Sequence, residues 1–212
     1  MWIDSHAHLS SEVVLPMIEG IMERARKMGI RKIVNICTDA KTLLAGFRLA
    51  AMYPEICNAG STTPHDVERE GEEMFLQFAS AARSGNLVAI GETGLDYHYE
   101  RSTRKFQHFF LEKYLELAQE CGLPVIFHCR EAFSDLFAVT DACYRGRAVL
   151  HCFTGTMEEA EGVLDRGWYL SFSGIVTYKK SQALRDIAKV VPLSQILLET
   201  DTPYLADRKS VV

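Results

Sequence analysis

Short apolar runs alternate with longer amphipathic stretches along the whole chain. The apolar runs are rich in isoleucine, valine and leucine, as is typical of strands that are buried on both faces of a parallel sheet. Eight runs are therefore predicted to be strands: Trp2–Asp4, Lys32–Cys37, Ile56–Gly60, Val88–Gly91, Val125–His128, Ala148–His151, Trp168–Phe172 and Ile196–Glu199.

Between these runs, apolar positions recur with the spacing of a helix. Glycine and proline separate the helical stretches from the strands that follow, for example at Gly29, Gly85 and Pro192. Seven helices are predicted: Pro16–Lys27, Ala40–Tyr53, Glu70–Arg83, Arg104–Glu120, Glu131–Tyr144, Met157–Asp165 and Gln182–Val190.

A chain that alternates buried strands with helices is expected to form an α/β fold with a parallel sheet. Eight such units favour a (β/α)8 TIM barrel, and a doubly wound open sheet is the alternative. The sequence contains no linker or internal repeat, so residues 1–212 are predicted to form one domain. No eighth helix can be built from Leu205–Val212, so the barrel is expected to lack it.

The missing helix predicts an exposed apolar face. The last predicted strand begins with Ile196, Leu197 and Leu198, whose side chains alternate between its two sides. Without a covering helix, a patch along the last and first strands, including Trp2, would face water. We expect this face to be buried against a second copy of the chain or covered by a rearranged terminus.

Composition narrows the classes of function. The net charge is −5 and the sequence pI is about 5.8, which argues against non-specific coating of nucleic acid but leaves a local basic groove open. The six cysteines form no C-x-x-C pair and no disulfide-like framework, as in proteins of a reducing compartment. No signal peptide precedes His6 and no apolar run reaches membrane-spanning length, so we expect a cytoplasmic protein without membrane contact.

Metal-capable side chains gather at the ends of the predicted strands. His6 and His8 lie two residues apart, so an extended backbone points both to the same side. In a barrel, the carboxyl ends of all strands meet at one rim, where such folds carry their chemistry. Six candidate metal ligands are expected at this rim: His6, His8, Glu92, His128, His151 and Asp201.

Four histidines and two carboxylates are more than one tetrahedral zinc ion needs. They suit two divalent ions bridged by a carboxylate, as in hydrolases that polarise a phosphoryl or carbonyl oxygen. Such ions lower the pKa of bound water toward about 7. Asp201 is the expected general base for that water.

The chain resembles the TatD family of metal-dependent hydrolases, which belongs to the amidohydrolase-like barrels, through most of its length. The resemblance implies a cytoplasmic deoxyribonuclease, typically a 3′ exonuclease on single-stranded DNA, that depends on Mg²⁺, with Zn²⁺ or Mn²⁺ as alternatives. The stretches that carry it are Asp4–Leu9, Gly91–Tyr97, His128–Ala132, His151–Gly155, Ser173–Val176 and Leu198–Tyr204.

The resemblance also implies roles for individual residues. His6, His8, Glu92 and Asp201 would hold a first metal. Glu92 would bridge to a second metal that is also held by His128 and His151, so Glu92 and Asp201 are the expected catalytic residues.

Other side chains near this rim are expected to contact the substrate: Arg130 through a phosphate, Tyr97 through base stacking, and His65. The chain departs from the family at Thr63, where an active-site histidine is usual. A threonine offers a hydroxyl but neither the charge nor the reach of an imidazole. Relatives also continue into a final helical region that this chain lacks.

Two other functions stay open at this point. The same metals would serve a small-molecule hydrolase that cleaves amides or esters, including aminoacyl esters. A shortened, inactive relative that serves as a binding module is the other alternative, supported by Thr63 and by the short end. The intact set of candidate ligands argues against the binding module.

Overall fold

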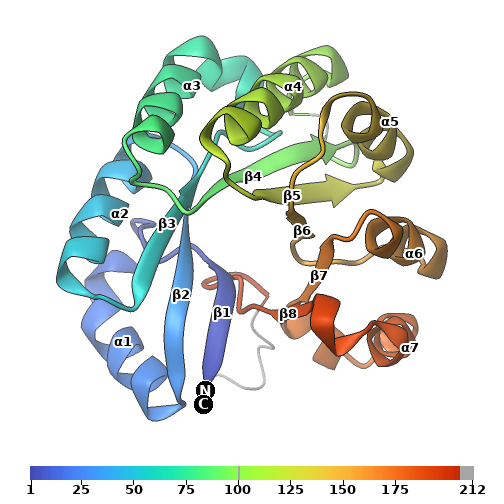
Figure 1. Ribbon diagram of the computed structural model, residues 1–212. Coiled ribbons are helices and arrows are strands. Elements are labelled where there is room, and N and C mark those ends of the chain that lie inside the picture. Colours follow the sequence, from blue (N-terminus) through green and yellow to red (C-terminus); the bar gives the residue numbers. More distant parts are fainter. Residues whose placement is uncertain (100, 206–212) are drawn as a thin grey trace.

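The computed structural model of the protein describes residues 1–99 and 101–205. Eight parallel strands pair in chain order from β1 to β8 and curve into a nearly closed barrel (Figure 1). This order confirms the predicted (β/α)8 barrel, because a doubly wound sheet reverses its strand order at a switch point. The strands are β1 (Trp2–Ala7), β2 (Ile30–Cys37), β3 (Ile56–Gly60), β4 (Ala89–Asp96), β5 (Val125–Arg130), β6 (Ala148–Leu150), β7 (Tyr169–Phe172) and β8 (Ile196–Leu198).

Seven α-helices lie around the outside of the barrel (Figure 1). No helix follows β8 within the residues described, as predicted, and residues 206–212 lie outside that range. None of the described helices is long and apolar enough to cross a membrane. The helices are α1 (Ile18–Lys27), α2 (Ala40–Met52), α3 (Val67–Arg83), α4 (Arg104–Cys121), α5 (Phe133–Cys143), α6 (Met157–Asp165) and α7 (Gln182–Val190), with short 3₁₀ turns at Leu15–Met17, Gly174–Thr177 and Leu193–Gln195.

Local sequence signals set several helix ends. Helix α2 begins with a capping box, in which the Asp39 side chain accepts from the Thr42 N–H and Thr42 Oγ1 accepts from the Asp39 N–H. Thr156 and Glu159 form the same arrangement at the start of α6. Helix α4 ends at Gly122, whose φ of 65° is the left-handed conformation that glycine adopts without steric cost. These signals explain why the pattern of apolar positions predicts the helices well.

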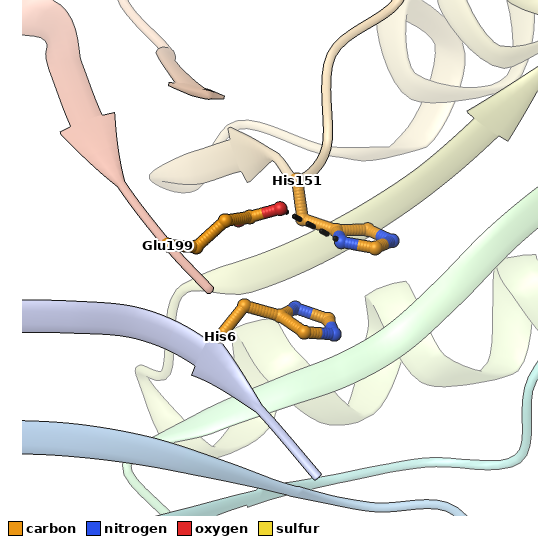
Figure 2. Close-up of side chains that lie close together, drawn as sticks. All are labelled: His6, His151 and Glu199. Atoms are coloured by element: carbon orange, nitrogen blue, oxygen red, sulfur yellow. Dashed lines mark ion pairs between the residues drawn. The ribbon is translucent and has the colours of Figure 1, made fainter. Parts of the chain in front are cut away.

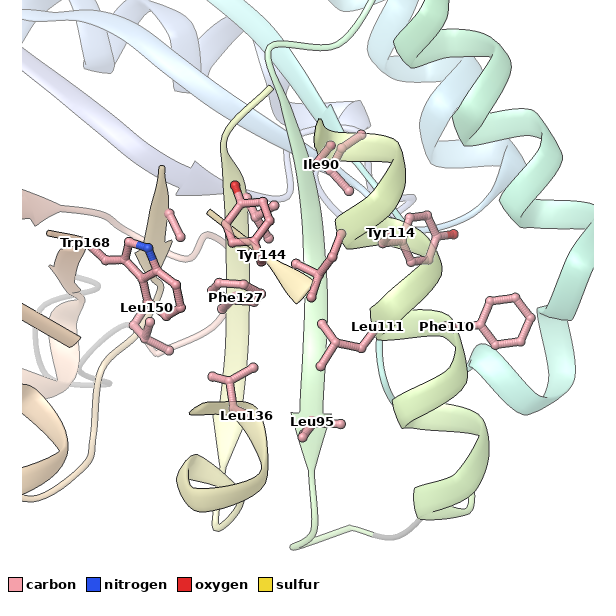
Figure 3. Close-up of a cluster of buried hydrophobic side chains, with 14 of the residues drawn as sticks. Ile90, Leu95, Phe110, Leu111, Tyr114, Phe127, Leu136, Tyr144, Leu150 and Trp168 are labelled. Carbon is pink, nitrogen blue, oxygen red and sulfur yellow. The ribbon is translucent and has the colours of Figure 1, made fainter. Parts of the chain in front are cut away.

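The largest cluster of the hydrophobic core lies between the strands and helices α2 to α7, and Figure 3 shows part of it. Tyr114 of α4 is fully buried there, and its hydroxyl accepts a hydrogen bond of 3.0 Å from the Thr62 N–H. Burial raises the pKa of Tyr114 to about 12, so the hydroxyl stays neutral. This contact ties the loop after β3 to the core, and that loop carries Thr63 and His65.

Strands β1 and β4 extend furthest beyond their predicted ends. Strand β1 continues to Ala7, which pairs with Asn35, and β4 continues to Asp96, which pairs with Arg130. The apolar pattern ends too early in both cases because the last residues of these strands are polar and buried toward the mouth of the barrel. His6 and Glu92, which we expected at the ends of their strands, therefore lie within β1 and β4.

Strands β1 and β8 do not form a regular ladder, and the segment after β8 joins them instead. The Asp201 N–H donates to the His6 carbonyl at 2.9 Å, and the His8 N–H donates to the Thr202 carbonyl at 2.7 Å. The buried Asp4 carboxylate accepts from the N–H and the hydroxyl of Thr200, at 3.0 and 2.7 Å. This seam brings Asp201 beside the two histidines of the first strand.

The apolar face predicted on β1 and β8 is exposed in the described part of the chain. Trp2, Ile3 and Leu198 have exposed fractions of 59%, 54% and 48%.

Burial of this face against a second copy stays a prediction, with the hydrophobic effect as its driving force. Sedimentation equilibrium at micromolar concentration is expected to show association, and Ile3→Lys is expected to weaken it. The prediction would be contradicted if the wild type sediments as a monomer and does not bind a dye that reports exposed apolar surface.

Candidate metal centre

All six candidate ligands converge at the carboxyl ends of the strands. His6, Glu92 and His128 lie within β1, β4 and β5, and His151 directly follows β6. His8 and Asp201 come from the segments that the seam holds together. Their side-chain atoms form two groups that share Glu92.

The first group surrounds Oε2 of Glu92. His6 Nε2 and His8 Nε2 face each other at 3.3 Å, and Oε2 lies 3.6 and 3.8 Å from them. Asp201 Oδ1 lies 3.7 Å from His6 Nε2 and 3.4 Å from His8 Nε2. Most of these distances are too long for hydrogen bonds. They are close to the roughly 3–3.6 Å that separates ligand atoms placed about 2.0–2.2 Å from one shared ion.

The second group surrounds the other carboxylate oxygen of Glu92. Oε1 lies 2.9 Å from His128 Nδ1 and 3.0 Å from His151 Nε2, and those two nitrogens are 3.3 Å apart. The two oxygens of Glu92 therefore face different sets of nitrogens, which is the geometry of a bridging carboxylate. These residues fit a pair of divalent ions by their donor types and by the spacing of their atoms.

Burial and charge shape the titration of this cluster. Burial by itself would raise the pKa of Glu92, but the neighbouring His151, His128 and His6 hold it well below its ordinary value. Burial would likewise lower the pKa of His151, but the carboxylates of Glu92 and Glu199 raise it well above the usual range. For His6, burial and the charge of His151 together lower the pKa. The cluster thus keeps Glu92 ionised, as a metal ligand must be.

Asp96, at the end of β4, contacts His128 of the second group on the side of the ring that faces away from Glu92. Its Oδ2 lies 2.8 Å from His128 Nε2, so the ring nitrogen that faces away from Glu92 is held by a carboxylate. Such a partner fixes the orientation of a ligating histidine. The sequence reasoning missed Asp96, although it lies four residues after Glu92 on one strand and so points to the same side.

Glu199 lies beside His151 and His6 of the cluster. Figure 2 shows its carboxylate directed at the ring of His151, with His6 beside both, and Oε1 lies 3.5 Å from His151 Nδ1. The rings of His6 and His151 stack at 3.9 Å. His6 Nδ1, His151 Nδ1 and the Glu199 oxygens are buried without hydrogen-bond partners among the described residues. Small shifts on metal binding would let these nitrogens donate to Glu199. The sequence signal for Glu199 is its position two residues before Asp201.

The loop after β3 brings His65, but not the hydroxyl of Thr63, toward the cluster. His65 Nε2 lies 3.6 Å from Asp96 Oδ2, and the His65 ring meets that of His128 edge-on at 5.4 Å. The Thr63 hydroxyl instead donates to Asp66 at 3.1 Å. His65 thus lies where a substrate could reach it, and its role there stays a prediction.

Arg130 and Tyr97 differ in the contacts that their side chains make. Arg130 ends β5, and its guanidinium lies 4.9 Å from the ring centre of Tyr99. The Tyr97 hydroxyl donates to Asp135 at 2.6 Å, and the guanidinium of Arg104 covers its ring at 3.9 Å. Tyr97 is therefore engaged in a network with α4 and α5, and its predicted contact with substrate is not tested by this geometry.

The fold and the set of converging side chains define the class of metal-dependent hydrolases built on a (β/α)8 barrel. The particular family follows from comparison with known proteins. Residues 3–211 match the family described as TatD related DNase, and the chain belongs to that family.

Curated relatives share about a third of their residues with this chain. The uncharacterized metal-dependent hydrolase YcfH of Escherichia coli K12 is 35% identical over 96% of this chain and 78% of its own length. The uncharacterized metal-dependent hydrolase YabD of Bacillus subtilis is 32% identical over 97% of this chain and 81% of its own length. The 3′-5′ ssDNA/RNA exonuclease TatD of Edwardsiella piscicida is 35% identical over 89% of this chain and 74% of its own length.

A solved structure agrees with the architecture. The crystal structure of YJJV, a TATD homolog from Escherichia coli K12, superposes with a TM-score of 0.89 at 29% identity. The match covers 96% of this chain and 80% of YJJV. The predicted family and barrel are thereby confirmed.

Proposed function

We propose that this protein hydrolyses phosphodiester bonds at the 3′ ends of single-stranded DNA, using two divalent metal ions. The observation that carries the proposal is the pair of ligand groups that share Glu92. Two ions held by these groups would suit the in-line displacement of phosphodiester hydrolysis. The name of the related exonuclease from Edwardsiella piscicida supports the choice of a nucleic acid as substrate.

The residues of the first group would hold and deprotonate the attacking water. When bound, the ions would polarise a phosphoryl oxygen and lower the pKa of water toward about 7. Asp201, whose Oδ1 lies 3.4 Å from His8 Nε2, would take up the proton of the water through its carboxylate. Arg130 and His65, at the mouth, would orient the phosphate through charge-assisted hydrogen bonds.

Mg²⁺ is the proposed ion in function, with Mn²⁺ or Zn²⁺ as alternatives that suit the histidine ligands. All six cysteines are free, in keeping with the reducing environment of the cytoplasm, where we propose that the protein acts. A single domain spanning residues 1–212 is part of the same proposal and is supported by the extent of the family match.

The proposal is tested with 3′-labelled single-stranded DNA and the three metals, beside a panel of amides and esters. DNA is expected to be cut, and activity confined to the panel would favour a small-molecule hydrolase. Arg130→Ala is expected to raise KM roughly 10- to 150-fold, the range for lost hydrogen bonds to charged groups, with kcat little changed. Arg147→Ala is the matched control, since this exposed arginine lies before β6 at the opposite end of the barrel. An unchanged KM for Arg130→Ala would exclude its phosphate contact.

A further inference from the structure

Tyr99, on the loop after β4, is an exposed aromatic residue beside the candidate metal centre. Its exposed fraction is 52%, unlike the engaged Tyr97. The Tyr99 ring meets that of His65 edge-on at 5.6 Å, and His65 meets His128 of the second ligand group at 5.4 Å. One intervening imidazole therefore separates Tyr99 from a candidate ligand.

Two arginines, Arg130 and Arg101, lie against the Tyr99 ring. The guanidinium carbons of Arg130 and Arg101 are 4.9 and 5.5 Å from its centre. In the described ranges 1–99 and 101–205, neither guanidinium forms an ion pair with a carboxylate. A protein of net charge −5 thus places two guanidinium groups on one aromatic ring at the mouth of its site. Such a combination suits a ligand with both phosphate groups and flat bases.

The position of Tyr99 is coupled to the metal centre through Asp96. Asp96 Oδ1 accepts from the N–H groups of His98 and Tyr99, at 2.9 and 3.0 Å, while Oδ2 faces His128 Nε2 at 2.8 Å. His98 Nδ1 pairs with Glu131 Oε1 at 2.8 Å and secures the other side of this loop. One buried carboxylate therefore fixes both a candidate ligand and the start of the aromatic loop.

We propose that Tyr99 is the stacking platform for a base next to the scissile phosphate, and that Arg101 and Arg130 contact the flanking phosphates. The proposal rests on the proposed function, because it assigns the nucleobase contact of the same site. Stacking on a single ring tolerates every base, so this platform gives affinity for single strands without sequence preference. On binding, the base takes the place of a guanidinium on the ring, and the freed arginine turns to a phosphate.

The test measures binding in the presence of EDTA at low salt, where no hydrolysis occurs and electrostatic contacts are strong. Two fluorescent single strands are compared by anisotropy, and they differ only in whether the two 3′-terminal nucleotides carry bases. Wild type is expected to bind the strand with bases roughly 5- to 150-fold more tightly, the range for base–aromatic stacking. Tyr99→Ala is expected to abolish this difference, and Tyr99→Phe to retain it. Phe109→Ala is the matched control, since Phe109 is 51% exposed but lies on α4.

The outcomes separate this proposal from the proposed function. Equal affinity of wild type for both strands, or a base effect that survives in Tyr99→Ala, would overturn the stacking role. Loss of the base effect in Tyr204→Ala instead would place the base on the opposite side of the rim, where Tyr204 is exposed near His8. A Tyr99-dependent base effect without hydrolysis in added metal would support the platform and defeat only the nuclease assignment.

Discussion

Replacing Asp201 by asparagine is expected to lower kcat roughly 100- to 10,000-fold, the contribution typical of a general base. The amide of asparagine cannot take up the proton of the attacking water, and it is a weaker, neutral ligand for a cation. The fold is expected to persist for a specific reason. Asp201 has a φ of 54°, and asparagine tolerates this left-handed conformation as well as aspartate does. The N–H bond of residue 201 to the His6 carbonyl is also preserved.

The measurement combines steady-state kinetics on labelled DNA with thermal unfolding of the metal-free protein. Asp165→Asn, an exposed change at the end of α6, serves as the control and is expected to behave as wild type. A kcat for Asp201→Asn within about threefold of wild type would remove Asp201 as the base. A large fall in the unfolding temperature of Asp201→Asn would instead show that the variant loses activity because the seam between β1 and the segment after β8 is disrupted.

Replacing Glu92 by glutamine is expected to abolish binding of both metal ions. Its two oxygens face separate nitrogen pairs, and one neutral amide cannot supply an anionic oxygen to each. The loss of metal affinity is expected to exceed the ~10- to 100-fold loss that follows removal of a residue that only hydrogen-bonds a metal ligand. Titration calorimetry of metal-free protein with Mn²⁺ measures the affinity and the number of ions.

Metal binding to the wild type is expected to weaken as the pH falls, because the raised pKa of His151 makes protons stronger competitors for its nitrogen.

Glu199→Gln is the matched variant for this experiment. Glu199 is as buried as Glu92 and carries the same charge, but it faces the back of His151 rather than the ligand groups. Its affinity loss is expected to stay within the ~10- to 100-fold range, with two ions still bound. Two ions bound to Glu92→Gln with near wild-type affinity would show that Glu92 is not the bridge. Equal losses in the two variants would point to a general effect of charge.

The sequence predicts the barrel and the convergence of six side chains because both follow from strand periodicity. Apolar runs locate the strands, and the end of each run approximates the register at which His128 and His151 reach the rim. The family resemblance then assigns the shared role to Glu92. These inferences use only local pattern and the common polarity of parallel strands.

Other features depend on contacts that local pattern does not encode. Asp96 lies beyond the predicted end of its strand, and Glu199 is the last residue of a predicted strand, but neither position reveals the histidine that its carboxylate faces. The seam through Asp4 and Thr200 joins residues at opposite ends of the chain. Residues of α4 and α5 contact the side chain of Tyr97 but leave that of Tyr99 exposed. The sequence alone does not show which of these two neighbouring tyrosines makes the contacts.

The seam between β1 and the segment after β8 has a consequence for how the protein is made. His6 and His8 leave the ribosome long before Thr200, Asp201 and Thr202, because strands β2 to β8 lie between them in the sequence. A nascent chain therefore carries these two histidines without Asp201 while those strands are being synthesised. Until the final strand has emerged, the first strand has its edge uncovered, and such an edge invites pairing with other chains. The two histidines and Asp201 come together only when these two distant segments of the chain have met.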